Sequence, residues 1–162
     1  MSSLSLPAVE LSVTNILQTR VIAQKLSKMV ALGDCLTLVG NLGAGKTLFA
    51  RAFIQSLTSV NEEVLSPTFT LVETYETAVG EIYHFDFYRI SHPEEVFELG
   101  FFEALSKGIL LIEWPCRLGN FLPANRLEIE INHEGNGNSR RIKLAQHGDL
   151  KSSDWDFQNL EI

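Results

Sequence analysis

The stretch Gly40-Asn41-Leu42-Gly43-Ala44-Gly45-Lys46-Thr47 decides the fold of this chain, because it has the spacing G-x-x-x-x-G-K-T. Glycines at these positions let backbone N–H groups turn inward around phosphate oxygens. The lysine then reaches the terminal phosphates, and the threonine hydroxyl can hold Mg²⁺. We therefore expect phosphate groups to bind at six consecutive residues, Gly43, Ala44, Gly45, Lys46, Thr47 and Leu48.

The segments on either side of this loop fit the same interpretation. An apolar strand is predicted at residues 36–39, and the following helix has apolar residues at Leu48, Ala50, Ala52, Phe53 and Leu57. A strand-to-helix turn presents the phosphates to a helix N-terminus, where free N–H groups and the helix dipole favour anions. The alternative, a glycine-rich turn that binds nothing, is disfavoured by this context.

The composition is that of one acidic domain. The chain has 162 residues, 45% of them hydrophobic, and a formal net charge of −7, which suits one domain with one core. It shows neither a secretory signal nor an apolar run long enough to span a membrane. Its two cysteines, Cys35 and Cys116, form no disulfide framework, so we expect a cytoplasmic protein.

The negative charge also bears on possible partners. An acidic surface does not attract free nucleic acid, whose binding needs Lys and Arg patches that neutralise phosphates. Any role near RNA is therefore expected to be indirect, through a basic partner, although net charge leaves room for a local basic site.

The ends of the chain are predicted from helix signals and polarity. Ser12 or Thr14 is expected to cap a first helix that runs to about Met29 or Val30. Its apolar side would consist of Ile16, Leu17, Val21, Ala23, Leu26 and Met29. The tail from about residue 146 to 162 is polar apart from Trp155 and Phe157, so we expect it to be mobile or loosely docked.

Strands are predicted through the middle of the chain. Residues 70–75 and 81–86, joined through Gly80, are expected to form an antiparallel pair. The uniformly apolar residues 109–112 are typical of a strand that is buried on both faces. Residues 126–132 and 140–145 indicate a hairpin with a flexible tip at 134–138.

Helical segments are expected between these strands. Pro93 suits the first turn of a helix, and Gly100 suits its C-terminal end. Residues 101–105 are expected to form a further helical turn.

Two acidic residues are placed where they could complete a nucleotide site. Glu113 follows the buried strand, an arrangement typical of a Walker B acid, and ligands in α/β sheets bind beyond such strand ends. By period-two alternation, His84, Asp86 and Tyr88 share one face of their strand and could line the site. Lys46, Asp86 and Glu113 are therefore the candidate catalytic residues, and Thr47 with Glu113 the candidate Mg²⁺ ligands.

Each of the remaining candidates also has a purely structural interpretation. Ser66 and Thr68 could be ordinary turn residues around a proline, and Trp114 could belong to the core. His84 in a strand is more often packed than catalytic. Arg89 could be a surface cation or could stabilise phosphates in the manner of an arginine finger.

Four blocks of sequence together resemble the TsaE (YjeE) family, small bacterial ATPases needed for the threonylcarbamoyladenosine modification of tRNA. The blocks are Gly40 to Thr47, Ser66-Pro67-Thr68-Phe69-Thr70-Leu71-Val72, His84-Phe85-Asp86-Phe87-Tyr88-Arg89, and Ile112-Glu113-Trp114-Pro115. Their order and spacing agree with the family from about residue 10 to 145. The last three blocks are uncommon outside it, so they are more specific than the phosphate loop.

The resemblance implies a single α/β domain over residues 1–162, a P-loop NTPase with a mixed β-sheet flanked by helices. ATP would bind at the loop, with Mg²⁺ near Thr47 and Glu113 and with Asp86 close by. The segment from Ser66 to Thr68 would act as a switch near the γ-phosphate, and Trp114 would matter for activity. Family members hydrolyse ATP slowly alone and support turnover of their partners TsaB and TsaD, of which TsaD transfers the threonylcarbamoyl group to adenosine 37.

The chain departs from the family pattern at Asn41, where aspartate is common, and at Cys116, where polar residues are usual. Two other functions remain open from sequence. A small-molecule kinase would need basic residues that close over the transferred phosphate. A nucleotide-regulated binding module would use ATP binding to bias assembly without catalysis.

Overall fold

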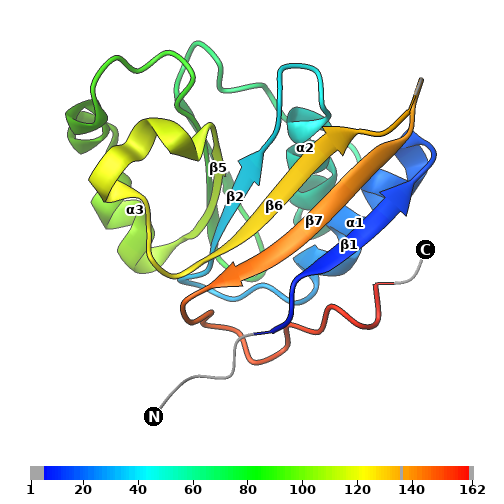
Figure 1. Cartoon of the computed structure of the whole chain (residues 1–162). Helices are drawn as coiled ribbons and strands as arrows, with labels where there is room; N and C mark the ends of the chain where they lie inside the picture. Colours follow the sequence, from blue (N-terminus) through cyan, green and yellow to red (C-terminus); the bar gives the residue numbers. More distant parts are fainter. Residues whose placement is uncertain (1–5, 136, 161–162) are drawn as a thin grey trace.

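The computed structural model describes residues 6–135 and 137–160, which fold around a seven-stranded sheet (Figure 1). The strands are β1 (Val9–Val13), β2 (Cys35–Val39), β3 (Val72–Glu76), β4 (Glu81–Asp86), β5 (Ile109–Glu113), β6 (Arg126–His133) and β7 (Arg140–His147). Their order across the sheet is β1-β7-β6-β2-β5-β4-β3. β2 is parallel to β5 and β6, and β4 is parallel to β5, whereas β7, β1 and β3 pair antiparallel with their neighbours. The sheet is therefore mixed, as predicted.

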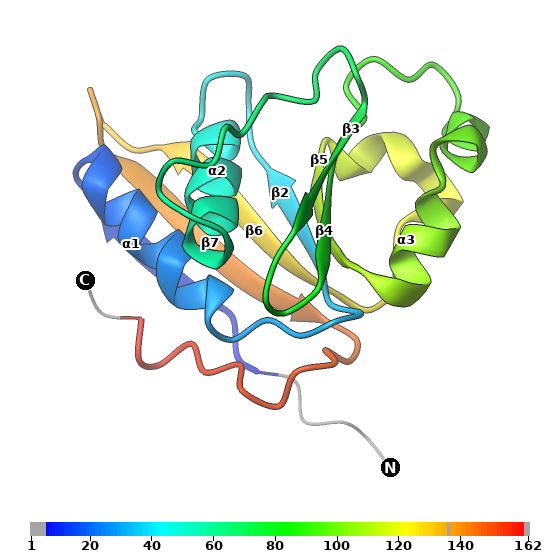
Figure 2. The same cartoon turned by 180° about the vertical axis from the view of Figure 1, so that it is seen from behind.

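Helices cover the two faces of the sheet. The α-helices are α1 (Ile16–Ser27), α2 (Lys46–Leu57) and α3 (Phe101–Lys107), and the 3₁₀ helices are η1 (Pro93–Leu99) and η2 (Pro115–Phe121). α1 and α2 lie side by side on the face seen in Figure 2. The other three segments pack against the opposite face, over the half of the sheet that contains β4 and β5.

The central strands are apolar because they are buried on both sides. In β5, Ile109 and Leu111 join the cluster beneath α1 and α2, whereas Leu110 and Ile112 join the cluster beneath α3 and the 3₁₀ helices. This alternation places Glu113, the next residue in the first series, on the α2 side of the sheet. The register pairs it with Asp86 of β4.

The strand predictions are largely confirmed, with one omission. β4 and its antiparallel pairing with β3 match the prediction, and Gly100 ends η1 with a φ of 71°. β1, which pairs with β7, was not predicted, because its five residues alternate polar and apolar side chains too briefly to stand out. In the hairpin tip, position 136 lies outside the described residues.

The prediction for the first helix was wrong in its details. The N-cap is Asn15, whose side-chain oxygen accepts a hydrogen bond from the Gln18 N–H at 3.0 Å. Ser12 lies in β1 instead. Ile16 and Leu17 were predicted to face the core, yet they are 49% and 66% exposed. α1 is buried through a different face, made by Thr19, Ile22, Ala23, Leu26 and Ser27.

The C-terminal tail is docked, contrary to the prediction of a mobile or loosely held segment. Trp155, Phe157 and Leu160 are buried in the core cluster beneath α1 and α2. The carboxylate of Asp34, just before β2, accepts hydrogen bonds from the Trp155 indole N–H at 3.1 Å and the Lys151 backbone N–H at 2.6 Å. A buried carboxylate with several donors fixes the tail in a way that the sparse apolar residues did not suggest.

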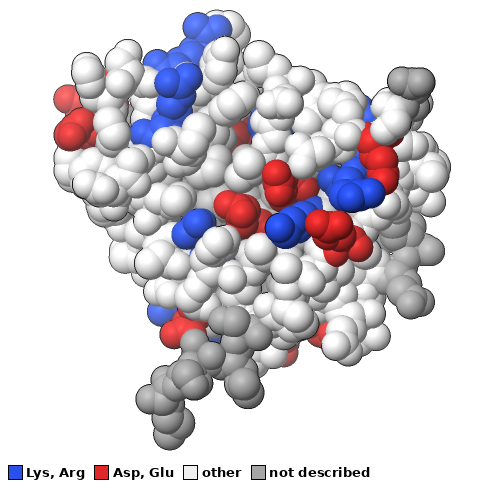
Figure 3. Space-filling model, in the orientation of Figure 1, with Lys and Arg blue, Asp and Glu red and all other residues white. Residues whose placement is uncertain are grey.

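The open face of β6, β7 and β1 carries charges of both signs. Across the middle of Figure 3, acidic and basic side chains alternate. Arg141 of β7, for example, lies 2.7 Å from Glu134 and 3.7 Å from Glu10. Among the described residues, none of the helices has the length and apolar content needed to cross a bilayer.

Candidate functional site

The loop between β2 and α2 is shaped by glycines with two different roles. Gly43 and Gly45 have φ values of 78° and 115°, and added Cβ atoms would meet nothing within 4 Å. These positions therefore need glycine for backbone conformation and leave the surface of the loop open. Gly40 is different, because a Cβ atom there would collide with the carbonyl oxygen of Ile131 in β6. The start of the loop is thus held against the neighbouring strand.

Lys46 begins α2, and its side chain lies under the loop. Its ammonium donates hydrogen bonds to the carbonyl oxygens of Gly40 and of Asn41, the latter at 3.2 Å. The same nitrogen lies 4.1 Å from the centroid of the Trp114 ring. Burial lowers the pKa of Lys46, and the negative charge of Glu113 opposes that shift. A partly desolvated cation beside an open loop is suited to anionic ligands.

Glu113 connects the loop to the sheet. The Thr47 hydroxyl donates to Glu113 Oε1 at 3.1 Å, and His84 Nε2 lies 2.8 Å from Glu113 Oε2. Both oxygens of this buried carboxylate are therefore engaged. His84 is fully buried, and its Nδ1 has no hydrogen-bond partner among the described residues. His84 thus lies behind the site and orients Glu113.

A second carboxylate lies on the neighbouring strand. Asp86 Oδ1 accepts a hydrogen bond from the Tyr88 N–H at 3.0 Å, and Oδ2 accepts one from the Thr68 hydroxyl at 3.3 Å. The Ser66 and Thr68 hydroxyl oxygens are 2.8 Å apart. Burial raises the pKa of the Asp86 carboxyl above its ordinary value, and the Tyr88 hydrogen bond opposes the rise. The segment predicted to act as a switch is therefore joined directly to a site carboxylate.

Two residues beside these carboxylates have unusual backbone conformations. Among the described residues, Leu71 and Trp114 are the non-glycine residues with positive φ, at 70° and 59°. Left-handed backbone costs an L-residue about 1–2 kcal/mol. Such strain tends to collect at functional sites. Trp114 follows Glu113 directly, and Leu71 accepts a hydrogen bond from the Asp86 N–H at 3.0 Å.

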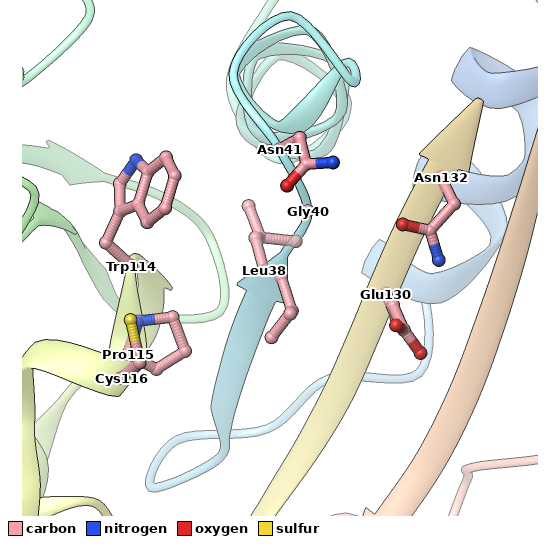
Figure 4. A pocket seen from close by; sticks show the side chains of 9 residues that line it. Leu38, Gly40, Asn41, Trp114, Pro115, Cys116, Glu130 and Asn132 are labelled. Atoms are coloured by element: carbon pink, nitrogen blue, oxygen red, sulfur yellow. The ribbon is translucent and has the colours of Figure 1, made fainter.

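These groups surround a cavity of 230 Å³. Its lining consists of Asn41, Leu42, Gly43, Gly45, Lys46, Thr47, Leu48, Thr68, Asp86, Glu113 and Trp114. A cavity of 220 Å³ adjoins it on the other side of Asn41 and Trp114 (Figure 4). The indole of Trp114, the thiol of Cys116 and the side chains of Glu130 and Asn132 contribute to that second space. The two cavities share Asn41 and Trp114, and most of the predicted residues line the first.

Some predicted residues lie elsewhere. Ala44 is buried on the far side of the loop, where its carbonyl oxygen accepts a hydrogen bond from Arg140 Nε at 2.9 Å. Arg89 does not line the cavity, and its guanidinium lies 4.2 Å from the centroid of the Phe69 ring. The contact between Arg140 and the loop was missed, because the two are 96 positions apart and share no local pattern.

The donor set limits which metal could bind here. Among the described residues, no group of three or more His, Cys, Asp or Glu side chains could hold an ion. Thr47 and Glu113 offer one hydroxyl and one carboxylate side by side. Mg²⁺ commonly takes one or two protein ligands and fills its shell with phosphate oxygens and water. This pair therefore fits Mg²⁺ that arrives with a nucleotide.

Comparison with known proteins identifies the family. The model of the threonylcarbamoyl adenosine biosynthesis protein TsaE matches residues 13–142. The chain belongs to the TsaE family. The tRNA threonylcarbamoyladenosine biosynthesis protein TsaE of Bacillus subtilis is 38% identical over 132 residues, which cover 81% of each chain. Its counterpart from Rickettsia felis is 40% identical over 114 residues, or 70% of this chain and 67% of the relative.

A solved structure has a similar fold. The crystal structure of Bacillus subtilis YdiB is similar with a TM-score of 0.73 and 31% sequence identity, over 91% of this chain and 90% of that one. The mixed α/β architecture is therefore shared with a protein of known structure. The family acts in tRNA threonylcarbamoyladenosine biosynthesis.

Proposed function

We propose that this chain is a P-loop NTPase of the cytoplasm that binds ATP with Mg²⁺, hydrolyses it slowly and thereby supports turnover of a TsaB–TsaD assembly. The observation that carries the proposal is the hydrogen bond from Thr47 of the phosphate loop to Glu113 of β5. It joins the two elements that a nucleotide-hydrolysing site needs, a phosphate cradle and an acid beside the metal position.

The phosphates would be bound by the backbone N–H groups of residues 43–48 and by Lys46. Thr47 and Glu113 would hold Mg²⁺, which neutralises charge on the phosphate oxygens when it is bound. Lys46 would exchange its hydrogen bonds to Gly40 and Asn41 for phosphate oxygens, because charge-assisted bonds are the stronger ones. Trp114 would cover one side of this lysine and limit its access to water.

We assign the positioning of the attacking water to Asp86. Both oxygens of Glu113 are already engaged by Thr47 and His84, whereas Asp86 Oδ2 holds only the long bond from the Thr68 hydroxyl. A water molecule can compete for that oxygen more easily. The raised pKa of Asp86 also makes it a better proton acceptor than an ordinary exposed aspartate.

The proposed partners follow from the family. TsaE proteins act in threonylcarbamoyladenosine biosynthesis, and a chain of net charge −7 is poorly suited to bind tRNA by itself. We therefore propose that it reaches tRNA indirectly, through TsaB and TsaD, and that TsaD carries out the transfer.

The test measures ATP hydrolysis and multiple-turnover tRNA modification with purified TsaB and TsaD. Wild-type protein should hydrolyse ATP slowly alone and be required for repeated modification cycles, and Lys46→Ala should lose both activities. Full activity of Lys46→Ala would contradict the assigned site. Phosphate that appeared on a metabolite instead of in solution would identify a kinase, and equal support by a non-hydrolysable analogue would identify a binding module.

A further inference from the structure

An aromatic cluster lies on the surface where η1, α3 and η2 meet. Phe97 of η1 stacks on Phe102 of α3 with ring centroids 5.2 Å apart. Phe121, at the end of η2, meets both rings edge-on at 5.2 and 5.6 Å. We call Phe97, Phe102 and Phe121 the aromatic platform. The three rings come from separate segments, so their arrangement is held by tertiary packing.

The platform is accessible although it is connected to the core. Phe97 and Phe102 are 56% and 42% exposed, whereas Phe101, which contacts Phe102 edge-on at 5.4 Å, is fully buried. Single exposed apolar residues are common on protein surfaces, but a packed group of large aromatic rings is typical of an interaction site. Aromatic side chains also supply much of the binding energy at protein interfaces.

The charges around the platform indicate what can bind it. Glu94 and Glu98 on η1 and Glu103 on α3 are exposed, and Lys107 pairs with Glu103 at 3.0 Å. The exposed charges of η1 and α3 are therefore mainly acidic, and η2 contributes one exposed cation, Arg117. Nucleic acid and anionic lipid would be repelled by this acidic rim, and a second copy of this chain would bring an acidic rim against another acidic rim.

We propose that the aromatic platform is a docking site for a protein surface that has an apolar pocket surrounded by Lys and Arg. The aromatic rings would fill the pocket, and the glutamates would pair with the basic rim. This inference rests on the proposed function, because it takes the protein partner to be the TsaB–TsaD assembly that the ATPase serves.

The fold connects this platform to the nucleotide site. η2 is preceded by Trp114, which lines the 230 Å³ cavity, and ends at Phe121 of the platform. A kink at Gly119, with a φ of 54°, brings η2 close to Pro93 at the start of η1. A partner bound at the platform would therefore contact the far end of the same short segment that contacts Lys46 through Trp114.

The test uses the double variant Phe97→Gln/Phe102→Gln and isothermal titration calorimetry against purified TsaB–TsaD with MgATP. Both side chains are largely exposed, so the fold should tolerate the change. We expect affinity to fall at least about tenfold, because truncated aromatic anchors commonly have this effect. ATP hydrolysis by the isolated variant should equal that of wild type. Leu17→Gln/Val60→Gln, which removes two exposed apolar side chains elsewhere, is the matched control and should bind normally.

A second variant tests the rim without altering the rings. Glu94→Lys/Glu98→Lys should slow association and reverse its dependence on salt, as expected for a basic partner. Wild-type affinity in both variants would overturn the docking site while leaving the proposed function intact. Failure of wild-type protein to bind TsaB–TsaD with or without nucleotide would overturn the partnership itself. Self-association of wild type that the Phe variant abolishes would identify a second copy as the occupant and refute the proposal.

Discussion

Glu113→Gln isolates the charge of the carboxylate that joins the phosphate loop to the sheet. Glutamine has nearly the same shape and keeps an oxygen that can accept the Thr47 hydroxyl hydrogen bond. The contact with His84 loses the charge of the carboxylate, which lowers the free energy of unfolding by about 1 kcal/mol. Removal of a negative charge beside Asp86 offsets part of that loss, because Glu113 contributes to the raised pKa of Asp86. The melting temperature should therefore change by only about 2–4 °C.

The effect on ATP turnover should be much larger. If Glu113 holds Mg²⁺ against the transferring phosphate, loss of its charge should lower kcat by about 10²–10³-fold, or about 2.7–4 kcal/mol in transition-state stabilisation. The requirement for Mg²⁺ should also shift to higher concentration. Steady-state phosphate release measured across a magnesium titration reports both quantities, and a thermal melt of the same preparation reports the fold.

Glu130→Gln is the matched control. Glu130 lies near the end of the adjacent strand β6 and lines the neighbouring 220 Å³ cavity together with Trp114, yet it belongs to the other side of the loop. The control should retain wild-type turnover and magnesium dependence. A Glu113→Gln protein that folds normally and has a kcat within about threefold of the wild-type value would refute the reasoning. Loss of a carboxylate that holds the metal should lower kcat by far more than threefold.

Three further experiments test other parts of the structure. Asp86→Asn should raise the free energy of unfolding at about pH 7, and the gain should vanish below about pH 4. The reason is that burial raises the folded pKa, so wild type loses stability as the pH rises through that value; an unchanged pH profile of thermal unfolding would contradict this. Asp34→Ala should cost about 2–4 kcal/mol in chemical unfolding and expose the tail to protease, because it leaves the Trp155 indole N–H unpaired; continued protease resistance would show that the tail docks without it. Native protein should show one fast thiol, the exposed Cys116, because burial raises the pKa of Cys35 to about 12; two fast thiols in a colorimetric assay would contradict the burial.

The parts of the structure that were predicted from sequence are those fixed by local chemistry. The glycines of the phosphate loop indicate positive φ values, and the uniformly apolar run of β5 is typical of a strand that is covered on both faces. Alternation in β4 was enough to place His84 and Asp86 on the face that meets Glu113. These features depend on spacing alone.

The features that were missed depend on contacts between distant segments. Nothing near Asp34 indicates that it accepts a hydrogen bond from Trp155, and nothing near Ala44 indicates its contact with Arg140. Ser12 does not cap α1 because it lies in β1, whose pairing with β7 is itself non-local, and Thr14 instead donates hydrogen bonds to the Gln18 side chain while Asn15 is the cap. The contacts of Asp34 and Ala44 with distant residues, and the pairing of β1 with β7, therefore have no local signal in the sequence.

The strand that carries the phosphate loop is fastened at both ends. At its start, Asp34 is tied to the C-terminal tail, and at its finish Gly40 fits against the backbone of β6 with no room for a side chain. A strand held at both ends has little freedom to move, so if the proposed nucleotide binds, we expect the accompanying movement on the opposite side of the 230 Å³ cavity. That side is lined by Thr68, which is bonded to Asp86, and by Trp114, which directly precedes η2, so a shift of either residue would be passed to segments outside the cavity.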